Sequence, residues 1–120
     1  MANTEIPDSI RELLPLSPAV FYILFALAEG EKHGYAIMKE AETISGGQFT
    51  MGPGTLYTTI QRLLELGLIE ETSTPSDSER RRRCYRLSRS GRKVFEAELN
   101  RMESLVRSAQ HRKLVPRGAR

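Results

Sequence analysis

The side chains most able to do chemistry in this sequence are arginines gathered in one short segment. Residues 79–93 carry eight basic side chains and one acidic side chain, whereas residues 1–78 carry four basic and eleven acidic ones. Four of the arginines are consecutive: Arg80, Arg81, Arg82 and Arg83. Adjacent guanidinium groups repel one another, and phosphates or a narrow minor groove would satisfy them. The segment therefore indicates contact with nucleic acid, with a solvated basic loop that has no partner as the alternative.

A second set of candidate side chains lies on a predicted helix just before this segment. Leucine and isoleucine recur at i, i+4, i+7 and i+8 and predict an amphipathic helix from about Pro53 to Leu66. The opposite face shows small polar and basic side chains, namely Thr55, Thr58, Gln61 and Arg62. Threonine and arginine donate to phosphates and base edges in the major groove. An ordinary surface helix is the alternative, and the basic segment that follows argues against it.

Catalytic and metal-binding residue sets are missing from the sequence. There are two histidines, His33 and His111, and one cysteine, Cys84. These do not form a spaced ligand set, and no phosphate-binding glycine loop follows a strand, so we expect no enzyme, no cofactor and no metal. Cys84 is predicted to be a free thiol in a strand, with an intermolecular disulfide or a redox switch as the alternative. Two competing hypotheses stay open: a metal-sensing regulator with a carboxylate site shared across a dimer, and a domain that binds protein rather than DNA.

Length and composition favour a single small domain. The chain has 120 residues, of which 39% are hydrophobic and 28% are charged, as in soluble globular proteins. The longest apolar run, Ala19 to Ala28, is shorter than the ~20 residues needed to cross a bilayer. With a polar N-terminus as well, we expect a cytoplasmic protein with no membrane contact. Residues 113–120 contain a sequence typical of an engineered protease-cleavage site and are left out of the fold prediction.

The elements that must position these side chains are mostly helices. Hydrophobic spacing, N-cap residues and glycine or proline stops predict helices at about 6–14, 18–29, 33–45, 53–66 and 89–110. Residues 68–72 and 82–87 are expected to form two strands of a hairpin with a basic tip. The order predicts a mainly α fold: a winged helix-turn-helix with a two-stranded β-wing and a long C-terminal helix.

The last predicted helix carries a heptad-like apolar seam. Its members are spaced by four and three residues: Phe95, Leu99, Met102 and Val106. Such a seam either folds back on the core or pairs with a second subunit. The short N-terminal helix has an apolar stripe that must also be covered, formed by Ile10, Leu13 and Leu14.

Motifs along most of the chain resemble the PadR family of transcriptional regulators. They cover about residues 16–110, and each is weak alone but specific in this order: HGYAI from His33, PGTLY from Pro53, GLI from Gly67, RRCYRLS from Arg82 and Gly91-Arg92. The resemblance, closest to the short-tailed subgroup, implies a homodimeric repressor that leaves its DNA operator on a small-molecule inducer signal, with the inducer at or near the dimer interface. The chain lacks tryptophan, so drug stacking between paired tryptophans is not available to it.

This resemblance divides the chain and suggests roles for its residues. Residues 1–15 would form an arm that aids dimerisation, residues 16–88 the DNA-binding domain and residues 89–112 the dimerisation helix. The residues expected in the major groove are Gly54, Thr55, Thr58 and Arg62. Tyr35 and Lys39 are expected at flanking phosphates, Tyr57 either there or in the core, and His33 as a helix cap. A dimer should bind a two-fold-symmetric site with half-sites about one helical turn apart.

Overall fold

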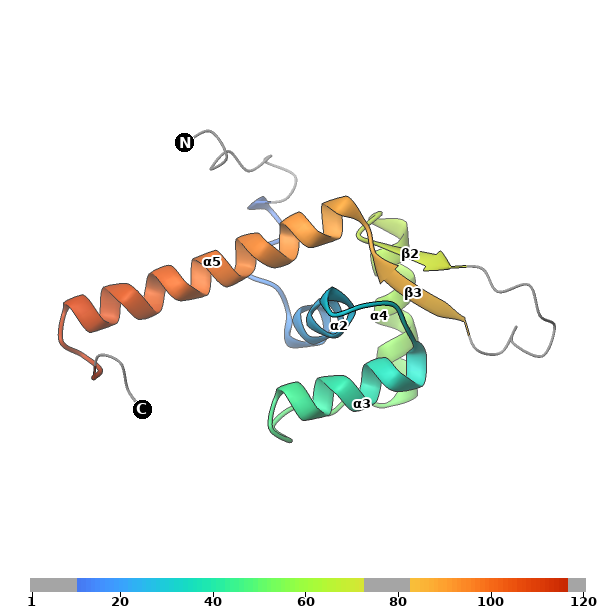
Figure 1. Ribbon diagram of the computed structural model, residues 1–120, viewed down its shortest axis with the longest axis horizontal. Coiled ribbons are helices and arrows are strands. Elements are labelled where there is room, and N and C mark those ends of the chain that lie inside the picture. Colours follow the sequence, from blue (N-terminus) through green and yellow to red (C-terminus); the bar gives the residue numbers. More distant parts are fainter. Residues whose placement is uncertain (1–10, 73–82, 117–120) are drawn as a thin grey trace.

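The computed structural model describes residues 11–72 and 83–116. In chain order its elements are α2 (Pro18–Ala28), β1 (Lys32–His33), α3 (Gly34–Ile44), α4 (Pro53–Glu65), β2 (Ile69–Thr72), β3 (Cys84–Leu87) and α5 (Arg89–His111). Figure 1 shows α2 at the centre, with α3 and α4 to one side of it, the strands near α4, and α5 running across the top and away from the rest. The winged helix-turn-helix predicted from the sequence is confirmed.

Helix α2 lies at the centre of the core because its side chains are apolar on nearly every side. Its start is fixed by Ser17, whose Oγ accepts a hydrogen bond from the Val20 amide at 3.4 Å, and by Pro18 in the first turn. Ile23, Leu24, Ala26 and Leu27 are buried, and α3, α4 and α5 all contact the helix. A helix with no polar face must be enclosed in this way.

Helices α3 and α4 are joined by a turn that glycines make possible. Gly46 and Gly47 follow α3 with φ of 65° and 82°, values that residues with a Cβ rarely adopt. In α4 the apolar stripe lies against the core, with Leu56, Ile60 and Leu63 buried. Burying this stripe directs the opposite face of α4 to solvent.

The sheet has one strand more than the predicted hairpin. Its order is β1-β3-β2, all antiparallel, with Glu70 opposite Arg86 in the β2–β3 pair and His33 opposite Cys84 in the β1–β3 pair. The two-strand prediction was therefore incomplete. Strand β1 is only two residues long, and its pairing partner lies about fifty positions away, so no local alternation of side chains marks it.

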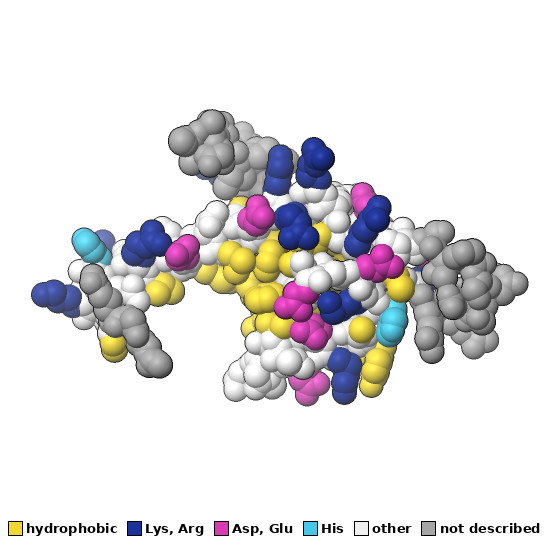
Figure 2. Space-filling model, in the orientation of Figure 1, with side chains coloured by type: hydrophobic (Ala, Val, Ile, Leu, Met, Phe, Trp, Pro, Cys, Tyr) yellow, Lys and Arg dark blue, Asp and Glu magenta, His cyan; other side chains and the backbone are white. Residues whose placement is uncertain are grey.

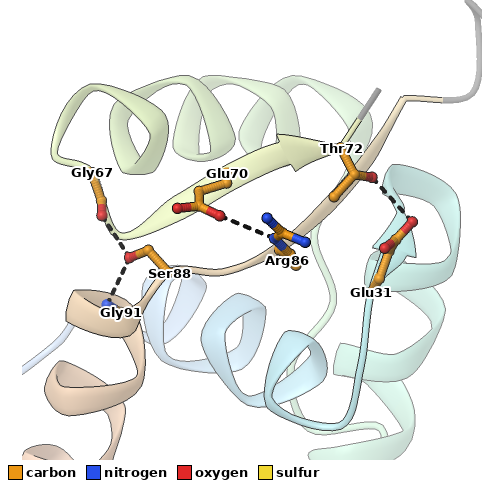
Figure 3. Close-up of polar contacts among 7 residues, drawn as sticks. All are labelled: Glu31, Gly67, Glu70, Thr72, Arg86, Ser88 and Gly91. Atoms are coloured by element: carbon orange, nitrogen blue, oxygen red, sulfur yellow. Dashed lines mark hydrogen bonds and ion pairs between the residues drawn. The ribbon is translucent and has the colours of Figure 1, made fainter. Parts of the chain in front are cut away.

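The junction between the sheet and α5 depends on Ser88 and Gly91. The Ser88 hydroxyl donates to the Gly67 carbonyl at 2.6 Å and accepts from the Gly91 amide at 3.0 Å (Figure 3). A Cβ on Gly91 would overlap the Leu68 carbonyl oxygen, so only glycine permits this approach. The serine thus caps α5 and anchors it to the end of α4 and the start of β2.

Helix α5 has an inner half that belongs to the core and an outer half that projects. Val94, Phe95 and Ala97 are buried, and the Phe95 ring lies 5.9 Å and 5.2 Å from the rings of Phe21 and Phe25. From Leu99 onward the helix buries no residue in the described chain, and Figure 1 shows it extending past the other elements. The sequence left two alternatives for the apolar seam, packing on the core or pairing with a second subunit. The inner half of α5 packs on the core of its own chain, and the outer half does not.

Candidate nucleic-acid interface

The solvent-facing side of α4 carries the side chains predicted to contact bases. Thr55, Thr58, Gln61 and Arg62 are exposed, and a shallow hollow on this face is lined by Tyr57, Thr58, Gln61, Arg62 and Glu65. Within the described residues Arg62 forms no ion pair. Glu65 accepts a hydrogen bond from Gln61 Nε2 at 3.3 Å, at the end of the helix away from Thr55 and Thr58. The arginine is therefore free to find an external acceptor.

The first turn of α4 is open to a close approach by a ligand. Gly52 is the N-cap and has no side chain to satisfy the first amide groups, and Pro53 has no amide hydrogen. A Cβ added to Gly54 would meet no atom within 4 Å, so intramolecular packing does not require a glycine there. Exposed amide groups and the positive end of the helix dipole favour a phosphate at such a place.

Tyr57 connects α4 to the start of α3. Its hydroxyl and ring edge occupy the space where a Cβ of Gly34 would be, while half of the side chain, 50%, stays exposed. The Tyr57 side chain thus packs against the start of α3 with one part and is exposed to solvent with the other. Any residue larger than glycine at position 34 would therefore displace the end of the Tyr57 side chain.

Two further candidates lie together on α3. Tyr35 is 60% exposed, and Lys39, one helical turn later, places its ammonium nitrogen 5.8 Å from the centre of the tyrosine ring. Both side chains are exposed, as the predicted contact with flanking phosphates requires. His33 stands at the N-cap of α3, as predicted, although its side chain makes no capping hydrogen bond, and the residue is also the end of β1.

The described part of the basic wing shows arginines held over acidic residues. Arg83 Nε lies 3.4 Å from Glu71 Oε2, and Arg86 Nε lies 3.0 Å from Glu70 Oε1, both pairs being exposed (Figure 3 shows the second). Exposed pairs of this kind contribute only about 0–1 kcal/mol and are readily exchanged for phosphate. Arg80, Arg81 and Arg82 lie outside the described residues.

The residues predicted for the dimer interface are separated by the structure. Leu13 and Leu14 pack partly buried against the core, Phe95 is 6% exposed within it, and Ile10 lies outside the described residues. Leu99 and Val106 are 37% and 53% exposed, and Met102 is half-buried. Figure 2 shows hydrophobic side chains gathered where α5 passes α2, with separate hydrophobic side chains farther out along the helix. Exposed Leu105, on the same half of α5, was missed because it lies outside the strict seam.

A buried acidic residue that no sequence motif marked lies at the base of the projecting helix. Glu98 is 1% exposed and accepts hydrogen bonds from Arg101 and from the Leu16 amide. The hydrogen bonds from Arg101 lower the pKa of the Glu98 carboxyl, burial opposes them, and the Leu16 amide lowers it further. The only sequence signal was an acidic residue inside an apolar stripe, three positions before an arginine.

The described residues hold no group of histidine, cysteine and acidic side chains able to bind a metal ion. Across the same residues, no helix is long and apolar enough to cross a membrane.

Comparison with known proteins decides the family. Residues 23–97, most of the chain, match the model of the Transcriptional regulator PadR-like family. The chain belongs to the PadR-like family. It is therefore a DNA-binding transcriptional regulator and not an enzyme. The matched region runs from α2 into α5. It includes all the described residues of α3, α4 and the wing that are candidates for contact with nucleic acid.

Two relatives differ in how much of their length is shared with this PadR-like chain. Over 86 residues it is 34% identical to the Transcriptional regulator Rv3488 of Mycobacterium tuberculosis, a match that covers 72% of this chain and 77% of the relative. It is 37% identical over 87 residues to an uncharacterized 37.1 kDa protein in transposon TN4556 of Streptomyces fradiae. That match again covers 72% of this chain but only 24% of the relative, so the chain spans about a quarter of its length.

A solved structure supports the fold of the PadR-like chain. Bacillus subtilis PadR, determined in complex with operator DNA, superposes with a TM-score of 0.62 at 24% identity, covering 71% of this chain and 47% of that one. At this level of identity the likeness establishes the winged helix.

Proposed function

We propose that this PadR-like regulator is a homodimer that binds a pseudo-palindromic DNA operator with α4 in the major groove. The observation that carries the proposal is the outer face of α4: exposed threonines, an arginine with no ion pair in the described chain and an open first turn, followed directly by the basic wing. A major groove about 12 Å wide admits a helix with such a face.

The residue roles follow from this docking. Thr55, Thr58 and Arg62 would contact base edges, and the amide groups near Gly54 would receive a phosphate. Tyr35, Lys39 and the exposed part of Tyr57 would contact the flanking backbone. The four wing arginines, Arg80, Arg81, Arg82 and Arg83, would contact phosphates or the minor groove.

Two subunits would join through α5 and the N-terminal arm. Three apolar side chains of the outer half of α5 are exposed in the single chain, at 37%, 58% and 53%: Leu99, Leu105 and Val106. Exposed apolar side chains on one helix are typical of a helix-pairing surface. The arm, through Ile10, Leu13 and Leu14, would add to this contact.

Regulation is proposed to be repression relieved by a small-molecule inducer. This follows from the family resemblance, and we place the inducer at or near the dimer interface. Since its operator lies on chromosomal DNA, we infer that the protein acts in the cytoplasm of a prokaryotic cell.

In vitro selection tests the proposal. The purified protein is incubated with a library of random-sequence duplexes, and bound DNA is amplified, sequenced and checked by gel shift at several salt concentrations. We expect an inverted repeat with half-sites about one helical turn apart to be enriched. Enrichment of single, unpaired half-sites would refute the dimer. No duplex binding even at low salt would move the function to binding protein.

A further inference from the structure

The Glu98 carboxylate is held from two directions. Oε1 accepts from Arg101 Nε at 2.6 Å, and Oε2 accepts from Arg101 Nη2 at 3.1 Å and from the Leu16 amide at 3.0 Å. The side chain is 1% exposed, and the described residues leave no buried side-chain nitrogen or oxygen without a partner. The carboxylate is therefore fully satisfied within one chain, with no contribution from a second subunit.

Glu98 occupies the point where α5 leaves the DNA-binding unit. It is the last buried residue of the helix, and Leu99 begins the projecting half. Leu16, on the other side of the contact, directly precedes the N-cap of α2, Ser17, and follows the N-terminal arm. One carboxylate thus joins the base of the projecting helix to the start of the central helix.

Packing alone does not call for a charge at this position. Val94, Phe95 and Ala97 fill the same region of α5 with apolar atoms, and replacing a buried ion pair with apolar groups is often neutral or stabilising. What the bidentate pair with Arg101, on the same helix, adds is a fixed position for the carboxylate, which then accepts from the Leu16 amide outside the helix. The second ion pair of α5, Glu103–Arg107, lacks this character, because both side chains are mostly exposed and no described residue outside the helix joins it.

We propose that Glu98 is a positioning residue that, with Arg101 and the Leu16 amide, fixes the angle of the projecting half of α5 and so sets the half-site spacing that the dimer accepts. The inference rests on the proposed function, since spacing has meaning only for a dimer on a two-part operator. In such a dimer, any change of angle at the base of α5 is carried along the projecting helix. It therefore alters the distance between the two α4 helices.

The test compares E98Q with wild type in the same random-duplex selection, using the full chain. Glutamine keeps the shape of the side chain but has one neutral acceptor oxygen, so it weakens the hydrogen bond from the Leu16 amide and cannot hold Arg101 through two oxygens. E103Q is the matched control, because it removes the other ion pair of the same helix. The readout is the half-site sequence and the distribution of half-site spacings among enriched inverted repeats.

We expect E98Q to select the same half-site sequence as wild type but a broader range of spacings. The preference for the best spacing over one a base pair longer or shorter should fall about twofold or more, the lower end of coupling between contacting residues. E103Q should match wild type. An unchanged spacing distribution for E98Q would overturn the inference while leaving the proposed function intact.

The same selection separates a failure of this inference from a failure of the proposed function. If the proposed function were wrong, the wild-type protein itself would enrich no inverted repeat. If circular dichroism shows that E98Q does not fold, R101K decides instead. Lysine keeps the positive charge but cannot donate to both carboxylate oxygens in the same fixed geometry. A broader spacing distribution for R101K supports the positioning role, and a wild-type distribution overturns it.

Discussion

At the scale of single residues, the proposed DNA interface depends on exposed side chains that the described chain leaves available to an external partner. Arg62 is exposed and unpaired within the described chain because the apolar stripe of α4 directs it outward. Gly54 and Gly34 differ in what surrounds them. The first faces open space that a ligand can enter, and the second is required by the Tyr57 ring.

Replacing Arg62 with alanine should remove discrimination at particular base pairs. A bidentate arginine–guanine contact contributes about 1–3 kcal/mol of discrimination, so affinity for the selected operator should fall while affinity for unrelated duplexes changes little. Fluorescence anisotropy on the operator and on single-base variants measures this. R62K is the control, because lysine keeps the positive charge but cannot donate two parallel hydrogen bonds to a guanine. Equal weakening on every sequence would make Arg62 a phosphate contact.

Glu98 predicts a pH dependence of stability. Its carboxyl has a lowered pKa in the folded protein, chiefly through hydrogen bonds from Arg101, so its contribution is present above the unfolded-state pKa and is lost as pH falls through the folded-state pKa. The difference in Tm between wild type and E98Q should therefore be largest near neutral pH and shrink in acid. Thermal melts of both proteins over a pH series measure it. A difference that is constant with pH would show that the charge of Glu98 does not stabilise the fold.

At the scale of elements, local signals explain which parts were predictable. The ends of α2, α4 and α5 follow capping serines, prolines and glycines that act within a few residues, and the predicted bounds of 18–29, 53–66 and 89–110 nearly match them. The pairing of strand β1 depends on partners 51 and 53 positions away and the Glu98 contact on a partner 82 positions away, so neither leaves a local pattern. The exposed face of α4 was predictable because burying one side of an amphipathic helix fixes the other.

The basic wing leads to a prediction about how the affinity for DNA depends on salt concentration. Replacing Arg80, Arg81, Arg82 and Arg83 with alanine should weaken binding on all sequences and flatten the slope of log affinity against log salt by about 3–4. The fold should persist, because Arg83 loses only an exposed ion pair with Glu71. Substituting lysine at all four positions is the control and should keep the slope. An unchanged slope in the alanine variant would remove the wing from the interface.

At the scale of the whole molecule, a compact DNA-binding unit is joined to a helix that extends beyond it (Figure 1). The inner half of α5 completes the core, which explains why Phe95 contacts the rings of its own chain. The outer half presents apolar side chains that a second copy would cover. The division falls at Glu98, so in the proposed dimer folding and dimerisation would use different parts of one helix.

Leu99→Glu should therefore give a folded monomer. The leucine is 37% exposed in the single chain, so a carboxylate there disrupts little of the core but would be buried in a paired seam. Sedimentation velocity should show loss of the dimer, with normal circular dichroism and most of the operator affinity gone. S108E, on the opposite side of α5, is the control. A Leu99→Glu protein that remains dimeric would contradict this interface.

The most direct test of the account is the affinity of the wild-type protein for duplex DNA across a salt series. A regulator that docks α4 and a basic wing on the backbone should bind duplexes, and its log affinity should fall linearly with log salt at a slope set by the number of phosphates contacted. Anisotropy with a labelled operator from the selection and with an unrelated duplex gives both slope and specificity. We predict a steep slope on both duplexes and tighter binding to the operator. Negligible affinity for either duplex at low salt would contradict the account.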